Sequence, residues 1–261
     1  MNLQIESRIQ GGIDKECPEF WARFNGPPDF DGKSVLEVGC GLGALSIDMA
    51  QRGAEHVTGV DILEDDVITA TRFTAVKYPQ LAAKLQFTNQ SIVELENDQF
   101  DLIVSKDAFE HIIDVPKMLQ QLHMSLANSG QVYIGFSPLY HSPYGDHDRR
   151  RAAFRTWGIL GRLLSALPWG HLFLEQQILK NHPSLKDREN ATMYDLKLNK
   201  MTIGKFRQHI KNSDFEATTL LVNRGENMVG KLLSLLRHIP FLESCCTYNA
   251  YCILRKAKSL G

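Results

Sequence analysis

The amino-acid sequence predicts an α/β protein built on a doubly wound, mostly parallel sheet. Two observations lead to this prediction. Five short apolar segments alternate with amphipathic helical segments along residues 33–136, and a glycine-rich turn follows the first apolar segment. Strands that alternate with helices form crossover connections, which place helices on both faces of a parallel sheet. A chain of 261 residues is long enough for one such domain carrying an insertion.

Each expected strand is a short apolar run that ends near a glycine or a polar residue. The five strands of the alternation are expected at 35–38, 56–60, 85–88, 100–105 and 131–136. Two further strands are expected near 217–222 and 248–254. Because they follow the five-fold alternation at the end of the chain, we expect them to close the sheet as an antiparallel hairpin.

Helix boundaries are indicated by capping residues and by glycine. Asp114 precedes an amphipathic stripe that runs from Val115 to Leu126, and Thr202 precedes a second stripe. Both side chains are good N-caps. The first 33 residues are expected to be loop-rich, because Gly11-Gly12 and Gly26-Pro27-Pro28 are strong breakers.

The pattern of strands stops at residues 138–199, which are rich in proline, histidine, arginine and aromatic residues. Helical periodicity is present at 154–167 and 172–179, but no strand pattern is. We therefore interpret 138–199 as a lid or acceptor-binding insertion within a single domain that spans residues 1–261.

Composition narrows the class of protein. Lysine plus arginine (29) nearly balances aspartate plus glutamate (30), so the overall basic excess typical of nucleic-acid binders is absent. No apolar run is long enough to span a membrane, and the N-terminus is unlike a signal peptide. The five cysteines lack metal-ligand spacing, which favours reduced thiols, a cytoplasmic location and no metal. The apolar stretch 229–242 fits either a homodimer face or a buried helix.

The turn after the first strand has the features of a cofactor-binding loop. Gly39 and Gly41 allow the backbone to pass close to a ligand, and Gly43 allows the next helix to pack tightly. That helix begins with free N–H groups that suit an anionic part of the ligand. Asp61 ends the second strand about twenty residues later, where a carboxylate can accept hydrogen bonds from ribose hydroxyls.

These residues resemble the motifs of class I S-adenosylmethionine-dependent methyltransferases. Residues 35–43, Val-Leu-Glu-Val-Gly-Cys-Gly-Leu-Gly, are similar to the first motif of that family, with Glu37 at its acidic position. The glycine spacing is G-x-G-x-G, whereas the NAD fingerprint is G-x-G-x-x-G. Gly59 to Ile62 is similar to the second motif. The resemblance implies S-adenosylmethionine as cofactor and seven strands in the order 3-2-1-4-5-7-6.

Further segments match in order. Ser91-Ile92 stands where the family commonly has an acid and an apolar residue against the adenine, and Ser105-Lys106 ends a segment similar to the fourth-strand motif. Phe109 to Ile112 resembles the segment after that strand. The residues that the resemblance and the loop together assign to the cofactor are Glu37, Gly39, Cys40, Gly41, Gly43, Asp61, Ile62, Ser91, Ile92, Ser105 and Lys106.

Three histidines are candidates for a general base. His111 follows the fourth strand, where the family often has a structural or cofactor-contacting histidine. His141 and His147 lie in the loop after the fifth strand, at the ligand edge of the sheet. His147 is flanked by Asp146 and Asp148, which could hold the loop or raise its basicity.

The acceptor is expected to contact the lid. Tyr144, Arg149 and Trp157 are the candidates, although three consecutive arginines also fit a solvated helix start and Trp157 also fits a lid core. Trp21 and Phe24 are candidates to fold over the cofactor.

The sequence thus predicts methyl transfer from S-adenosylmethionine to a small-molecule acceptor, at a hydroxyl with a histidine base. Segment 105–108, Ser-Lys-Asp-Ala, lacks the motif that grips planar amines in nucleic-acid N-methyltransferases. The alternatives are N- or C-methylation of a metabolite, an NAD-dependent oxidoreductase, and a cofactor-binding subunit without catalysis.

Overall fold

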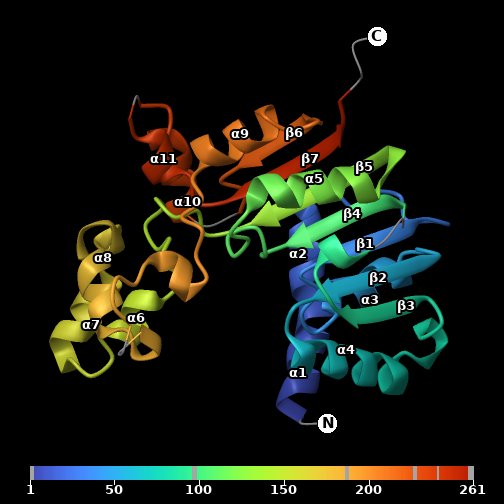
Figure 1. The fold of residues 1–261 in the computed structure, drawn as a ribbon, viewed down its shortest axis with the longest axis horizontal. Coiled ribbons are helices and arrows are strands. Elements are labelled where there is room, and N and C mark those ends of the chain that lie inside the picture. Colours follow the sequence, from blue (N-terminus) through green and yellow to red (C-terminus); the bar gives the residue numbers. More distant parts are fainter. Residues whose placement is uncertain (1–2, 96–98, 186–187, 226–227, 240, 258–261) are drawn as a thin grey trace.

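A computed structural model describes residues 3–95, 99–185, 188–225, 228–239 and 241–257. Its centre is one seven-stranded sheet in the order β3-β2-β1-β4-β5-β7-β6, which confirms the predicted fold and strand order (Figure 1). The strands are β1 (Ser34–Val38), β2 (His56–Asp61), β3 (Leu85–Asn89), β4 (Phe100–Lys106), β5 (Leu126–Phe136), β6 (Phe215–Val222) and β7 (Ala250–Lys256).

Strands β1 to β5 are parallel, and β7 runs antiparallel to both β5 and β6. The strand order reverses between β1 and β4. In open sheets of this kind, ligands bind beyond the carboxyl ends of the strands at the point of reversal. β5 begins at Leu126, earlier than expected, and its pairing with β4 shifts register between Phe100 and Leu102.

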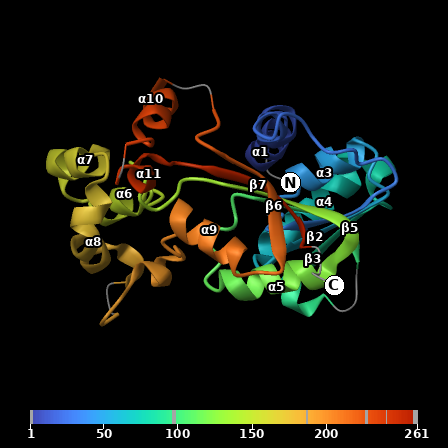
Figure 2. The same cartoon turned by 90° about the horizontal axis from the view of Figure 1, so that it is seen from above.

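Helices cover both faces of the sheet, with α5 and α9 on one side and α1 and α3 on the other (Figure 2). Neighbouring strand residues point alternately into the two layers: Leu36 and Ile103 belong to the core under α5 and α9, whereas Val35 and Val104 belong to the core under α3. This two-sided burial explains the continuous apolar strands. The main helices are α3 (Ala44–Gln51), α4 (Glu64–Lys77), α5 (Val115–Ser125), α9 (Ile203–Lys211), α10 (Met228–Leu236) and α11 (Glu243–Cys246).

The capping predictions hold. The Lys117 backbone N–H donates to the Asp114 carboxylate at 3.0 Å, at the start of α5. The Lys205 backbone N–H donates to Thr202 Oγ1 at 3.3 Å, at the start of α9. α10 is not a wholly buried helix, since Leu232 is more than half exposed.

The expectation of a loop-rich N-terminus is wrong. Helix α1 (Leu3–Gly11) continues through a π-helical turn (Gly12–Glu16) into α2 (Cys17–Ala22). Ile9, Ile13 and Cys17 are spaced for one helical face, and all three are buried. A Cβ at Gly12 would lie 2.9 Å from the Ala44 Cβ, so this glycine permits close helix packing instead of ending a helix. Tertiary packing here outweighs the weak intrinsic preference of glycine.

Residues 138–199 form a helical segment beside the sheet (Figure 1). It contains α6 (Arg149–Ala153), α7 (Gly158–Ala166) and α8 (Gly170–Asn181), and its described residues include no strand. The segment has its own apolar cluster, which includes Tyr140, Phe154 and Ile178. It follows β5 directly and therefore starts at the carboxyl edge of the sheet.

Candidate active site

A cavity of about 220 Å³ lies beside the glycine-rich loop, between the carboxyl end of the sheet and the N-terminal helices. Gly39, Gly41 and Gly43 all have positive φ, at 78°, 48° and 80°. A Cβ on Gly43 would approach Phe87 at 2.8 Å, whereas one on Gly41 would meet no protein atom within 4 Å. Gly43 therefore permits packing, and Gly41 leaves open space at the cavity. The cavity is lined by Arg8, Ile9, Gly12, Glu16, Cys17, Glu37, Gly39, Cys40, Gly41, Leu42, Ala44, Leu45, Asp66 and Lys106.

Asp61 holds the loop from the end of β2. Its Oδ2 accepts a hydrogen bond from the Gly41 N–H at 2.8 Å, and its Oδ1 accepts one from the Leu63 N–H at 2.9 Å. Both bonds are charge-assisted. Asp61 thus fixes the position of the glycine turn, although it does not itself line the cavity.

Glu37 lines the cavity and is buried at the end of β1. Burial raises the pKa of its carboxyl to about 8, and the hydrogen bond that Ser46 Oγ donates to Glu37 lowers it only in part. Across the cavity, Lys106 ends β4 and forms ion pairs with Glu16 and Asp107, each at 3.1 Å. Burial works against its charge, but these acids outweigh burial and raise the pKa of Lys106.

Several predicted cofactor residues lie outside the cavity lining. Ser105 is buried, and its Oγ donates to the Val38 carbonyl at 3.1 Å, which ties β4 to β1. Ser91 caps a 3-10 turn, Ile92 is buried in the core, and Ile62 is exposed. Their contact with a cofactor stays a prediction.

The N-terminal helices line the smaller cavity, which was not expected from the sequence. Trp21, a candidate to fold over the cofactor, does not line it. Trp21 is buried in the core on the α3 side of the sheet, where its Nε1–H donates to Asp48 Oδ2 at 2.7 Å. Five residues that precede Trp21 in the sequence line the cavity instead: Arg8, Ile9, Gly12, Glu16 and Cys17. The signal in the sequence is the four-residue spacing of Ile9, Ile13 and Cys17, which is typical of one apolar face of a helix.

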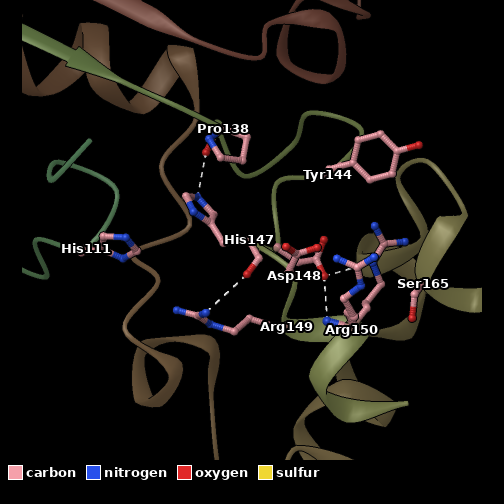
Figure 3. Close-up of a pocket in the computed structure, with 10 residues that line it drawn as sticks. His111, Pro138, Tyr144, His147, Asp148, Arg149, Arg150 and Ser165 are labelled. Atoms are coloured by element: carbon pink, nitrogen blue, oxygen red, sulfur yellow. Dashed lines mark hydrogen bonds and ion pairs between the residues drawn. The ribbon is translucent and has the colours of Figure 1, made fainter. Parts of the chain in front are cut away.

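A larger cavity of about 540 Å³ lies between the sheet edge and the helical segment (Figure 3). The loop after β4 contributes His111, the loop after β5 contributes five residues between Pro138 and Asp148, and α6 and α7 complete the wall. The lining residues are His111, Pro138, Tyr144, Asp146, His147, Asp148, Arg149, Arg150, Arg151 and Ser165.

His111 and His147 lie side by side in this cavity, with ring centroids 5.3 Å apart (Figure 3). His111 Nδ1 lies 2.6 Å from the Lys197 carbonyl oxygen, and His147 Nε2 lies 3.1 Å from the Pro138 carbonyl oxygen. A carbonyl only accepts, so each of these nitrogens carries a proton that it donates. In the neutral ring, the second nitrogen of each histidine then has a free lone pair.

Asp146 raises the pKa of His147, as expected, but other causes outweigh it. Burial, together with the adjacent His111, lowers the pKa of His147 to about 4. Asp146 is occupied elsewhere: its Oδ2 accepts hydrogen bonds from the Arg150 backbone N–H at 2.8 Å and from Arg150 Nε at 3.0 Å.

Arg150 is almost fully buried, which excludes a solvated helix start for this arginine. Its guanidinium also donates to the Leu167 carbonyl at the end of α7. The buried pair of Asp146 and Arg150 therefore fixes the loop after β5 against the helical segment. Arg151 is exposed, and half-buried Arg149 donates to the Leu196 carbonyl at 3.0 Å through Nη2.

The remaining predicted residues divide between cavity and surroundings. Tyr144 lines the cavity and is half exposed. Trp157 packs on Phe154 with ring centroids 5.0 Å apart and is outside the lining. His141 is also outside it, with Nδ1 2.8 Å from Ser244 Oγ.

The two cavities share one loop. Lys106 lines the smaller cavity, and His111, five residues further along, lines the larger one.

Comparison with known proteins decides the family. Residues 9–218 match the family described as "Methyltransferase domain". The chain belongs to this family. Its strand order is also the one that the resemblance to class I S-adenosylmethionine-dependent methyltransferases implies.

Among curated relatives, "Ubiquinone biosynthesis O-methyltransferase" of Pseudomonas paraeruginosa is 36% identical over 103 residues, which cover 40% of this chain and 44% of the relative. The protein of the same name from Neisseria meningitidis is 30% identical over 120 residues, covering 46% and 50%. The chain thus spans about half the length of these relatives or less.

Solved structures share the fold. A geranyl diphosphate methyltransferase in complex with SAM has a TM-score of 0.60 at 9% identity, covering 98% of this chain and 92% of that one. An S-adenosylmethionine-dependent methyltransferase from Mesorhizobium loti has a TM-score of 0.54 at 18% identity, covering 94% and 100%. Among the described residues, no helix combines the length and apolar character needed to cross a membrane.

Proposed function

We propose that this methyltransferase methylates a hydroxyl group of a small-molecule acceptor, with His147 as the base and residues 138–199 as the acceptor-binding lid. The observation that carries the proposal is the 540 Å³ cavity, in which two histidines with free lone pairs lie next to the loop that lines the cofactor cavity.

The smaller cavity suits S-adenosylmethionine in charge and shape. Glu16 and Asp66 supply negative charge, and Arg8 and Lys106 supply positive charge, which matches the zwitterionic amino-acid end of the molecule. The open space at Gly41 accommodates a close ligand. Asp61 retains lone pairs for ribose hydroxyls. When bound, S-adenosylmethionine supplies an electrophilic methyl group on a positively charged sulfur.

The acceptor site has to align a nucleophile and remove its proton. As the acceptor oxygen forms its bond to the methyl carbon, the carbon–sulfur bond breaks and its electrons stay on sulfur. We assign the hydroxyl proton to the free nitrogen of His147, with His111 as the neighbouring candidate. Tyr144 and Arg149 line the cavity and are placed to orient the acceptor, while Trp157 would contribute only if the lid moves.

Two further observations favour oxygen as the methylated atom. Two curated relatives, each matching less than half of the chain, are named O-methyltransferases. Segment 105–108 lacks the planar-amine motif, and the net charge of −1 gives no general attraction for nucleic acid. N- or C-methylation of a metabolite is the alternative outcome.

The test is the His147→Ala variant, with His141→Ala as the matched control. His147→Ala should lower turnover about 10²–10⁴-fold, the usual contribution of a positioned base, without changing the affinity for S-adenosylhomocysteine. His141→Ala should retain turnover, because His141 does not line the cavity. Wild-type turnover in His147→Ala would remove the base assignment.

A further inference from the structure

A carboxyl group lies next to the two histidines that line the larger cavity. Glu110 and His111 come from the loop after β4, and His147 comes from the loop after β5. One potential metal-ligand atom of each residue lies within 4.8 Å of those of the other two. The methyl-transfer chemistry proposed above uses the histidines but gives Glu110 no role.

Glu110 is buried, and one of its carboxyl oxygens has no partner within the described part of the chain. Its side chain is 4% exposed, and Oε2 has no hydrogen-bond partner among the described residues. The described residues also give it no ion pair, since Lys106 is bound to Glu16 and Asp107. A buried carboxyl group is costly to ionise unless it is paired with a cation or coordinates a metal, and otherwise it stays protonated.

The histidines are arranged as metal ligands usually are. Each donates one ring N–H to a backbone carbonyl, His111 to Lys197 and His147 to Pro138. Such a second contact fixes the tautomer and the ring orientation of a ligating histidine. The nitrogens left with lone pairs are Nε2 of His111 and Nδ1 of His147.

We propose that Glu110, His111 and His147 form a binding site for a divalent transition-metal cation. Two imidazoles and one carboxylate suit Zn²⁺ or Mn²⁺ better than Mg²⁺ or Ca²⁺, which prefer all-oxygen sites. Ligand atoms about 2.0–2.2 Å from one ion lie roughly 3.4 Å apart in a tetrahedral site, so closure from 4.8 Å requires a contraction of up to about 1.4 Å. Of the three side chains, His111 is the exposed one.

Three protein ligands leave at least one coordination position open towards the cavity. Resting on the proposed function, the site would bind the acceptor through its hydroxyl oxygen. A cation lowers the pKa of a bound hydroxyl, so the proton leaves to water before the oxygen attacks the methyl group. His147 would then contribute to catalysis as a metal ligand.

The test is metal binding by the purified, chelator-treated protein, without cofactor or acceptor. Zn²⁺ is titrated in competition with a chromophoric chelator, and Co²⁺ is added separately as a spectroscopic probe. We expect one Zn²⁺ per chain and Co²⁺ absorption typical of nitrogen and oxygen ligands, without a thiolate charge-transfer band. Loss of an outer contact weakens metal affinity about 10–100-fold, so loss of a ligand should weaken it about 100-fold or more.

Glu110→Gln is the decisive variant, because it keeps the shape and removes the charge. Metal-free Glu110→Gln should be at least as thermostable as the wild type, while Zn²⁺ should raise the Tm of the wild type alone. The matched control His141→Ala should bind Zn²⁺ normally. Equal Zn²⁺ affinity in wild type and Glu110→Gln, or no Zn²⁺ binding by either, would overturn the proposal.

The two proposals can fail separately. Zn²⁺ binding that depends on Glu110, together with methylation of nitrogen or carbon, would retain the metal site and reject the proposed function. Undiminished O-methylation by Glu110→Gln in excess chelator would retain the proposed function and reject the metal site.

Discussion

Replacing Asp61 by alanine tests whether the cofactor binds beside the glycine turn. The Asp61 carboxylate accepts hydrogen bonds from the N–H groups of Gly41 and Leu63, at 2.8 and 2.9 Å. It therefore positions the glycine turn, and we expect its remaining lone pairs to accept hydrogen bonds from the ribose hydroxyls. Asp61→Ala removes both functions.

The expected loss follows from the hydrogen bonds removed. Two charge-assisted bonds to ribose are worth about 1.5–3 kcal/mol each, or about 3–6 kcal/mol together. At about 1.4 kcal/mol per decade, affinity for the cofactor should fall roughly 10²–10⁴-fold. Asp61→Asn keeps one acceptor oxygen and should lie between wild type and Asp61→Ala.

Isothermal titration calorimetry with S-adenosylhomocysteine measures this loss directly. Asp65→Asn is the matched control, because it removes an equal charge from the exposed first turn of α4. It should bind within about twofold of wild type, as expected for a screened surface charge. Wild-type affinity in Asp61→Ala, or an equal loss in Asp65→Asn, would refute the assignment.

Two predictions concern stability. The pKa of Glu37 is raised from 4.5 to about 8 in the folded protein, so ionisation in the unfolded state alone makes the folded state less favourable as pH rises from 4.5 to 8. Glu37→Gln cannot ionise, so its free energy of unfolding relative to wild type should increase by up to about 5 kcal/mol between pH 4.5 and pH 8. Urea unfolding at several pH values measures this difference, and a difference that does not change with pH would contradict the raised pKa of Glu37. Arg150→Met leaves Asp146 buried without its cation and should destabilise the protein by about 3–5 kcal/mol. The exposed control Arg151→Met should change stability by less than about 0.5 kcal/mol in the same assay, and equal effects would reject the burial argument.

The sheet could be predicted because its signals are local. β1 and β2 end where the apolar runs meet Gly39 and Asp61, and Asp114 and Thr202 cap the helices that they precede. The order of the strands came from a family resemblance and not from periodicity. Glu37, Gly41 and Lys106 line the cofactor cavity because the strand ends that carry them are neighbours in the sheet.

The features that could not be predicted depend on distant partners. The N-terminal helix passes through Gly11-Gly12 because Ile9 and Ile13 pack against other elements, which no local propensity reveals. Arg150 is buried because Asp146 and the end of α7 enclose it.

The second site shows the same limit. His111 and His147 were recognised individually, but their loops are 36 residues apart, and only the fold places the rings 5.3 Å apart. The unpaired Oε2 of Glu110 is visible only once the surrounding side chains are in place.

The most direct test of the proposed function is to identify the atom that receives the methyl group. The protein is incubated with S-adenosylmethionine carrying an isotopically labelled methyl group and a set of hydroxylated small molecules, and the products are examined by NMR. The account predicts a labelled methyl ether or ester on an acceptor oxygen, with the signal lost in His147→Ala. A labelled methyl group on nitrogen or carbon would contradict it.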